Sequence, residues 1–223
     1  MPVINTNVAS IQARSNFERV QRDMDTAIAR LSSGKRINTA ADDAAGQAIS
    51  GRMESQIRGL NMQIQNTRDG QSMVDSMEGT MQEVTGILQR MRELAVQASS
   101  GIATAADRGY LDTEMEALVA EIDAISVNTT FNETVLFTGA TFSFFADINI
   151  TGTAIITTTL GMETSTLSVE AADVEIGTQA DAIAAIVDID NAISTLSDKR
   201  AIMGSISNRM DHVIDNLTNV IAN

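Results

Sequence analysis

Residues 49–98 read ISGRMESQIRGLNMQIQNTRDGQSMVDSMEGTMQEVTGILQRMRELAVQA and carry the clearest structural signal in the chain. Mostly apolar side chains recur along them in fourteen steps over 49 residues, a mean spacing of 3.5 residues. This is the repeat of a left-handed coiled coil, in which helices pack along one apolar seam. The seam consists of Ile49, Met53, Ile57, Leu60, Ile64, Thr67, Gln71, Val74, Met77, Met81, Val84, Leu88, Met91, Leu94 and Ala98. The spacing predicts one long helix that packs against others along this seam.

The long helix is not expected to be stable by itself. Thr67 and Gln71 place polar side chains in its seam and leave open a break near Asp69-Gly70. The helical region also contains glycines, each of which costs roughly 1 kcal/mol relative to Ala in a helix. They are Gly46, Gly51, Gly59, Gly70, Gly79 and Gly86. Partner helices along the seam must therefore supply the stability.

Three other segments, residues 5–33, 105–126 and 180–222, also show helical spacing of apolar residues. In the first segment the spacing is kept by Val8, Ile11, Phe17, Val20, Met24, Ile28 and Leu31. In the last it is kept by Ile183, Ile186, Ile189, Ile193, Leu196, Met203, Ile206, Met210, Val213, Leu217 and Val220. The seams of the long helices are expected to face each other and the shorter third helix.

The stretch LSSGKRINTAADD, residues 31–43, interrupts the helical spacing. Gly34 is suited to end the first helix, because a residue just past a helix often adopts a left-handed conformation that Gly tolerates. Thr39, Asp42 and Asp43 are residue types that cap the start of a helix. We therefore expect a loop here, with the long helix beginning shortly after it.

Residues 134–178 differ in kind from the rest of the chain. They are rich in β-branched residues and Phe, and Gly139, Gly152, Gly161 and Gly177 are candidates for turns. Short strands that form hairpins are expected, inserted between helical segments. The predicted fold class is mainly α: a long antiparallel helical bundle or coiled-coil rod with a small β-hairpin insertion.

The net charge of −14 is unevenly distributed. Residues 109–198 contain 15 acidic residues and no Lys or Arg, whereas residues 1–108 contain 12 acidic and 12 basic residues. The acidic middle repels nucleic acid and anionic lipid, so neither a nucleic acid nor a membrane is expected as a partner. A solvated acidic surface without any further role fits the same pattern.

Several classes of function are disfavoured by the residues present. The chain has no Cys and a single His, His212, which leaves no recognisable nucleophile–base constellation. It also lacks an HExxH, a P-loop and a GxGxxG pattern. The start, MPVINTNVAS, does not resemble a Sec-type signal, and no apolar run approaches the length of a membrane span. We therefore expect no enzymatic activity, no cofactor and no bound metal.

Five stretches resemble bacterial flagellin and occur in the order found in that family. They are MPVINTNVASIQARSNF (1–17), LSSGKRINTAADDAAGQAIS (31–50), QRMRELAVQASSG (89–101), EIDAISVNTTFN (121–132) and AISTLSDKRAIMGSISNRMDHVIDNL (192–217). Several long motifs in one order are far more specific than a single short pattern. The resemblance implies a structural subunit of the flagellar filament, which assembles with copies of itself through helical terminal regions and serves motility.

The resemblance also implies a division of the chain into regions. These are a filament-core helix with a connecting loop (1–43), the N-terminal part of a helical rod (44–133), a short variable insertion (134–178) and the C-terminal part of the rod (179–223). The implied filament-core packing residues are the seven apolar residues of the first helix, from Val8 to Leu31. Flagellins continue with an apolar C-terminal arm that is expected to pair with residues 5–33 and is missing from this chain.

The same resemblance implies a set of partners. Besides copies of the chain, they are the flagellar export apparatus with a chaperone, the filament cap protein and Toll-like receptor 5. By motif match, the receptor contacts carry over to Gln89, Arg90, Glu93, Leu94, Gln97 and Glu114. An alternative is that these residues make contacts between filament subunits. The implied location is the extracellular flagellum, reached without a Sec-type signal peptide.

Two alternative functions remain open. A hook–filament junction protein, also called hook-associated, resembles flagellin mainly at its ends; the intact LSSGKRINTAADDAAG and QRMRELAVQ stretches favour flagellin. A secreted enzyme with its activity in the insertion is disfavoured, because residues 134–178 contain no His, Cys, Lys or Arg.

Overall fold

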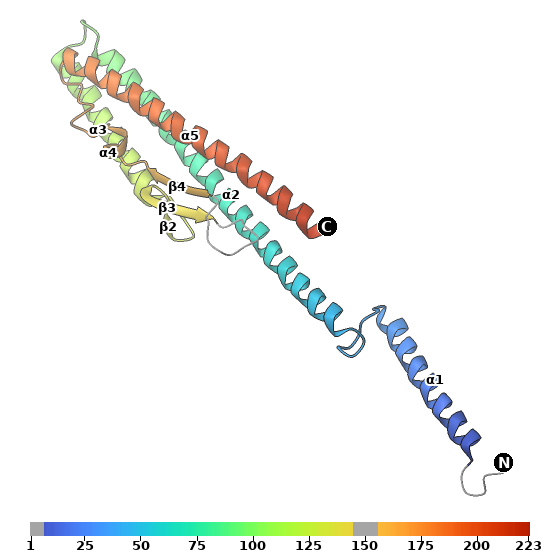
Figure 1. Ribbon diagram of the computed structural model, residues 1–223. Helices are drawn as coiled ribbons and strands as arrows, with labels where there is room; N and C mark the ends of the chain where they lie inside the picture. Colours follow the sequence, from blue (N-terminus) through green and yellow to red (C-terminus); the bar gives the residue numbers. More distant parts are fainter. Residues whose placement is uncertain (1–6, 145–155) are drawn as a thin grey trace. The chain divides into compact units, whose positions relative to one another are not determined.

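The computed structural model describes residues 7–144 and 156–223 (Figure 1). The chain divides into two compact units, Met1–Arg58 and Gly59–Asn223. The described residues are mostly helical, with two short antiparallel sheets. The predicted fold class, mainly α with a small β-hairpin insertion, is confirmed.

Helix α1, Val8–Ser33, belongs to the first unit. It begins after Asn7, whose side chain accepts the N–H of Ser10 at 3.1 Å. It ends, as predicted, at Gly34, which has a φ of +66° and donates its N–H to the carbonyl oxygen of Arg30. No residue of α1 is buried within the chain.

Two aspartates organise the loop after α1. Asp42 accepts hydrogen bonds from the backbone N–H groups of Asn38 and Thr39 and from the Thr39 hydroxyl. The bond from the Thr39 N–H contributes most to lowering the pKa of Asp42, because it stabilises the charged carboxylate. Asp43 accepts the N–H of Gly46 at 2.8 Å and so caps the next helix.

Helix α2, Ala44–Ala98, runs through its polar seam positions without the break that the sequence left open. Thr67 is buried, but its hydroxyl donates to the carbonyl oxygen of Gln63 one turn earlier at 2.8 Å. Gln71 donates from its side-chain nitrogen to Asp211 at 2.8 Å. Both polar groups are therefore satisfied while the helix stays regular.

Helix α5, Gln179–Ala222, runs antiparallel to the second-unit part of α2 (Figure 1). Polar contacts join α5 to α2 and to the residue that follows it: Gln179 to Ser99, Arg92 to Asp190, Arg200 to Glu78, and Gln71 to Asp211. From one pair to the next, the residue number on α5 rises while the number of its partner falls by a similar amount, as expected for antiparallel helices. One register is therefore kept over the whole contact.

Helix α3, Ala105–Asn128, begins with a capping box in which Thr104 and Asp107 exchange hydrogen bonds. Arg108 closes the turn between α2 and α3, because its guanidinium donates to the carbonyl oxygens of Ala98 and Ser100. These are carbonyls that the end of α2 leaves without a helical partner.

The core of the second unit is lined by α2, α3 and α5 and consists mainly of aliphatic residues and Met. Fully buried examples are Met77, Met81, Leu88, Met91, Ile122 and Leu196. A smaller cluster joins Leu60 and Ile64 of α2 to Leu217 of α5. Because helices pack along shared seams, the core forms almost without aromatic residues, Phe137 being a fully buried exception.

Two hairpins follow α3. Strands β1, Thr130–Phe131, and β2, Thr134–Val135, pair antiparallel across a turn in which Asn132 and Glu133 have positive φ. Strands β3, Thr138–Phe144, and β4, Ile156–Gly161, form the second pair, with an irregularity in register between Thr138 and Thr141. Residues 145–155 of the predicted insertion, including Gly152, lie outside the described residues.

The segment after β4 returns to the helices. It includes the short helix α4, Thr164–Leu167, and buries Met162, Leu167, Val169, Val174 and Ile176. Two carboxylates of α3 bind its backbone: Asp123 accepts from the N–H and hydroxyl of Thr164, and Asp112 accepts from the N–H of Ile176. This part of the predicted β-rich region, residues 162–177, is therefore packed on α3 and contains no described strand.

Candidate recognition surface and assembly faces

Arg90 forms an ion-pair cluster that joins α2 to α3. Its Nε and Nη2 donate to Oε1 of Glu114 at 2.9 and 2.8 Å, and its Nη1 donates to Oε2 of Glu93 at 3.1 Å. The hydrogen bonds to Glu114 and then Glu93 raise the pKa of Arg90. All three side chains remain about half exposed or more. The cluster is therefore preorganised and open to a partner with polar or charged groups.

The other predicted contact residues differ in exposure: two lie on the surface and one is buried. Gln89 and Gln97 are exposed on α2 and flank the cluster along the helix. Leu94 is buried in the core, 1% exposed, because it lies on the seam three residues after Met91. It supports the surface from beneath and offers almost no side-chain area of its own.

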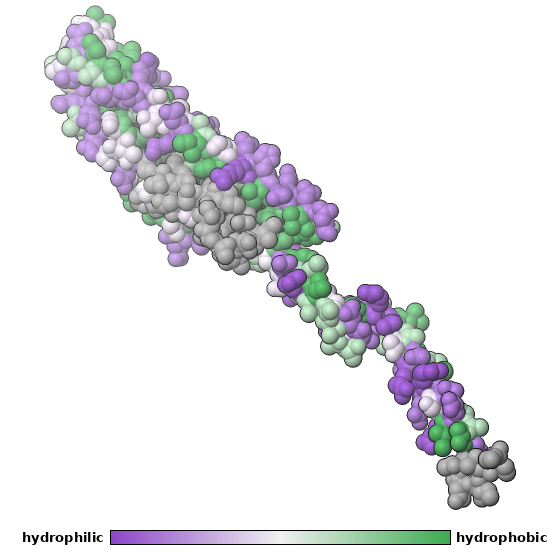
Figure 2. Space-filling view, in the orientation of Figure 1, coloured by the Kyte–Doolittle hydropathy of each residue, from purple (hydrophilic) through white to green (hydrophobic). Residues whose placement is uncertain are grey.

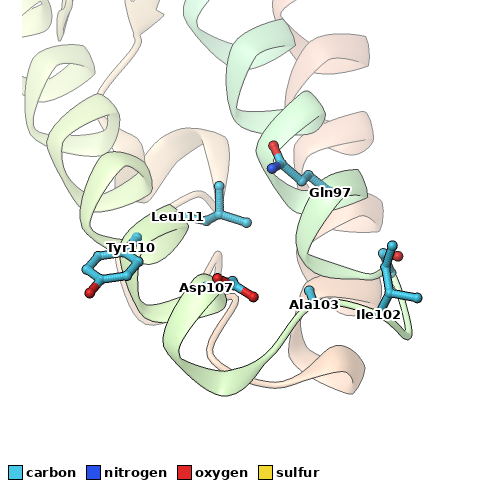
Figure 3. A pocket seen from close by; sticks show the side chains of 7 residues that line it. Gln97, Ile102, Ala103, Asp107, Tyr110 and Leu111 are labelled. Atoms are coloured by element: carbon cyan, nitrogen blue, oxygen red, sulfur yellow. The ribbon is translucent and has the colours of Figure 1, made fainter.

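A groove lies beside the cluster, between the end of α2 and the start of α3. Its volume is about 480 Å³, and Figure 3 shows Gln97 and Leu111 extending toward one another across it. Ile102 and Tyr110 at its edge are 92% and 78% exposed. Sequence reasoning missed both, although Tyr110 precedes the seam residue Leu111 and could have been assigned to the outer side of its helix.

A second surface missed by sequence reasoning spans α2 and α5. Arg92 Nε donates to Asp190 Oδ1 at 2.6 Å, which raises the pKa of Arg92. Val96, Ile183 and Val187 are also exposed. Val96 follows Arg92 by one helical turn, and Val187 precedes Asp190 by one turn. A groove of about 450 Å³ along α2 is lined by Gln89, Arg92, Glu93 and Val96.

The first unit carries the largest set of exposed apolar side chains. All seven predicted filament-core residues of α1, Val8, Ile11, Phe17, Val20, Met24, Ile28 and Leu31, are at least 55% exposed. Apolar residues lie open between polar ones along α1 on the face seen in Figure 2. At the start of α2, Ile49, Met53 and Ile57 are 39–53% exposed, whereas from Leu60 onward the seam residues other than Gln71 are buried. Such apolar surface is typical of an interface.

Within residues 7–144 and 156–223, no group of three or more His, Cys, Asp or Glu side chains is arranged to hold a metal ion. Among the described helices, none is long and apolar enough to cross a membrane.

Most of the chain matches proteins of a known family. Residues 4–141 match the model of the bacterial flagellin N-terminal helical region. A flagellin of Halalkalibacterium halodurans is 36% identical over 222 residues, which cover 99% of this chain and 82% of that protein. The chain belongs to the bacterial flagellin family. Flagellin FlaB1 of Treponema pallidum, another relative, is 35% identical over 95% of this chain and 79% of its own length.

Solved structures agree with the family assignment. The crystal structure of Bacillus cereus flagellin is 32% identical, with a TM-score of 0.57, and the likeness covers 69% of this chain and 88% of that one. A putative flagellar hook-associated protein from Vibrio parahaemolyticus has a TM-score of 0.66, covering 81% of this chain and 95% of its own, at 15% identity. At that identity the likeness extends to the fold alone, so the family assignment rests on the flagellin matches.

Proposed function

We propose that this member of the flagellin family is a structural subunit of the flagellar filament and assembles with copies of itself through its helical terminal regions. The observation that carries the proposal is the exposed apolar face of α1, a helix that buries no residue within its own chain. Helices in proteins gain most of their stability by packing an apolar face against a partner. Motility is the role that such a polymer serves.

The regions of the chain take distinct roles in this proposal. Residues 1–43 supply the filament-core helix and its loop, and residues 44–133 and 179–223 supply the two parts of the rod. Residues 134–178 contain the outward-facing insertion. The hydrogen bonds of Asp112 and Asp123 to the segment after β4 favour a projecting part limited to the strands.

The assembly proposal is tested by one substitution on the apolar face of α1 and one on the other side of the helix. Val20→Asp places a charge on this face. Thr26→Asp adds the same charge at an exposed position two residues from both Met24 and Ile28, and residues two apart point to different sides of a helix. No residue of α1 is buried, so neither substitution disturbs a packed core. We expect electron microscopy and sedimentation to show filaments for the parent chain and the Thr26 variant but not for the Val20 variant.

The test is made on the chain itself and on a version extended by the C-terminal arm that the resemblance implies. Equal assembly of the Val20 and Thr26 variants would contradict a role for this face. Short cap-like oligomers in place of filaments would favour the alternative, a hook–filament junction protein.

A bacterial filament protein must leave the cell, so we propose secretion through the flagellar export apparatus, with help from a chaperone, and an extracellular location. The filament cap protein is the proposed partner at the growing end. Secretion should stop when the flagellar export channel is disabled and continue when the Sec pathway is inhibited.

We also propose that Toll-like receptor 5 recognises the surface around Arg90. The supporting observation is the Arg90–Glu93–Glu114 cluster, flanked by Gln89 and Gln97, which holds an exposed guanidinium in a fixed geometry. Arg residues held in this way are frequent energetic centres of protein interfaces. Leu94 contributes by packing beneath the cluster.

Receptor signalling by monomeric protein tests this second proposal. Arg90→Ala should reduce signalling potency roughly tenfold or more, as expected for an interface centre. Arg68→Ala removes the same side chain from an exposed position elsewhere on α2 and should leave potency unchanged. Undiminished potency of the Arg90 variant would exclude this surface.

A further inference from the structure

The described methionines fall into two groups by exposure. Met24, Met53 and Met62 are 60%, 53% and 60% exposed, whereas the other eight are at most 5% exposed and lie in the second unit. A peroxide must reach the thioether sulfur to oxidise it, so the folded chain offers these three positions first. The core methionines are shielded by the helices packed around them.

Two of the three exposed methionines lie among other exposed apolar side chains. Met24 is four residues from both Val20 and Ile28 on the apolar face of α1, and all three are at least 55% exposed. Met53 is likewise four residues from both Ile49 and Ile57 at the start of α2. Residues four apart share one helix face.

Met62 is exposed for a different reason. It lies two residues from both Leu60 and Ile64, the buried seam residues of the second unit, and residues two apart point to different sides of a helix. It is therefore equally accessible but outside the seam.

We propose that oxidation of Met24 and Met53 to methionine sulfoxide by a peroxide makes the apolar faces of the first unit polar and thereby blocks subunit assembly. The inference rests on the proposed filament function. The sulfur lone pair attacks one peroxide oxygen, and an S–O bond forms as the O–O bond breaks. The sulfur loses two electrons to the peroxide, whose other oxygen leaves as water with both protons. The product carries a strongly polar S–O group that an apolar interface cannot hydrate.

The proposal is tested by treating the folded monomer with hydrogen peroxide and mapping the sulfoxides by mass spectrometry of its peptides. Met24, Met53 and Met62 should be oxidised well before any core methionine. The critical concentration for assembly, measured by sedimentation, should rise roughly tenfold or more, as expected when an unpaired polar group enters an interface.

Two variants separate the assembly effect from oxidation in general. Met24→Leu with Met53→Leu keeps both faces apolar and removes both sulfurs, so its assembly should be unaffected by peroxide. Met62→Leu should lose assembly after treatment as the parent does. Equal losses in the double variant and the parent, or core methionines oxidised as fast as the exposed ones, would overturn the inference.

If the proposed function is wrong, the chain will not assemble even without peroxide, and this result is distinct from those above. In that case retention of the folded monomer on a hydrophobic-interaction column decides the inference. Peroxide should lower the retention of the parent but not that of the Met24/Met53 double variant. The same change in both, or no change in the parent, would overturn it.

Discussion

Arg200 of α5 donates two hydrogen bonds to one carboxylate oxygen of Glu78 on α2, from Nη2 at 2.6 Å and from Nε at 2.9 Å to Oε1. Both side chains are more than a third exposed, so solvent screens their attraction. We expect a small favourable coupling free energy between them, as is usual for exposed pairs. A double-mutant cycle with Arg200→Ala and Glu78→Ala, measured by urea unfolding, gives this value. The coupling should shrink in high salt; strictly additive effects of the two substitutions would show that the contact contributes nothing.

Glu133 occupies a backbone conformation that favours Gly. Its φ is +64° and that of Asn132 is +48°, so both central residues of the β1–β2 turn are left-handed. A side chain with a Cβ is strained there, and Gly is not. Glu133→Gly should therefore raise the free energy of unfolding by about 1 kcal/mol. Glu133→Ala keeps the Cβ and should give little change; an equal gain from Ala would point to the charge of Glu133 instead.

Asp123 binds the segment after β4 to α3. Its Oδ1 accepts from the N–H of Thr164 at 3.1 Å and from the Thr164 hydroxyl at 2.8 Å, and Thr164 is buried. Asp123→Ala leaves both donors without this partner and should cost about 1–3 kcal/mol in unfolding free energy. Glu121→Ala removes an exposed carboxylate two residues away and should cost less than about 0.5 kcal/mol. Similar losses from both variants would contradict the assigned role.

Asp107 makes the start of α3 sensitive to acid. The hydroxyl of Thr104 donates to its carboxylate at 2.6 Å and is the largest cause that lowers the pKa of Asp107 below its ordinary 3.8, followed by the Thr104 N–H. Because the folded state holds the proton less tightly, the stabilisation is present above pH 3.8 and is lost as the pH falls toward the lowered value. An NMR titration should therefore place the Asp107 midpoint below 3.8.

The control for this titration lies on the same helix. Thr104→Ala should move the Asp107 midpoint back up, whereas Thr113→Ala, whose hydroxyl donates to the Gly109 carbonyl oxygen, should leave it in place. A midpoint at 3.8 or above in the parent protein would refute the expected direction.

The helices could be predicted from the sequence because the residues that define them are close together in the chain. The seam of period 3.5, residues 49–98, lies within α2 and ends with it at Ala98, and Gly34 marked the end of α1 through its tolerance of positive φ. The same periodicity misled at Thr67, where a hydroxyl can bond within its own helix and needs no break.

The candidate surface was less accessible because it depends on register between distant segments. Arg90 and Glu114 were named through the family resemblance, but their contact requires α3 to return along α2 at one particular offset. Arg92 and Asp190, 98 positions apart, gave no local signal at all. Leu94 shows the converse: its seam position already indicated burial, and the structure places it in the core.

The proposed filament role requires that other subunits cover the apolar face of α1, and hydrogen exchange measures this most directly. In the monomer, the backbone amides of α1 should exchange rapidly while those of α2 and α5 that line the second-unit core remain protected. After assembly, the α1 amides should become protected as its apolar face is covered. An α1 that is already protected in the monomer, or one that stays unprotected in the filament, would contradict the account.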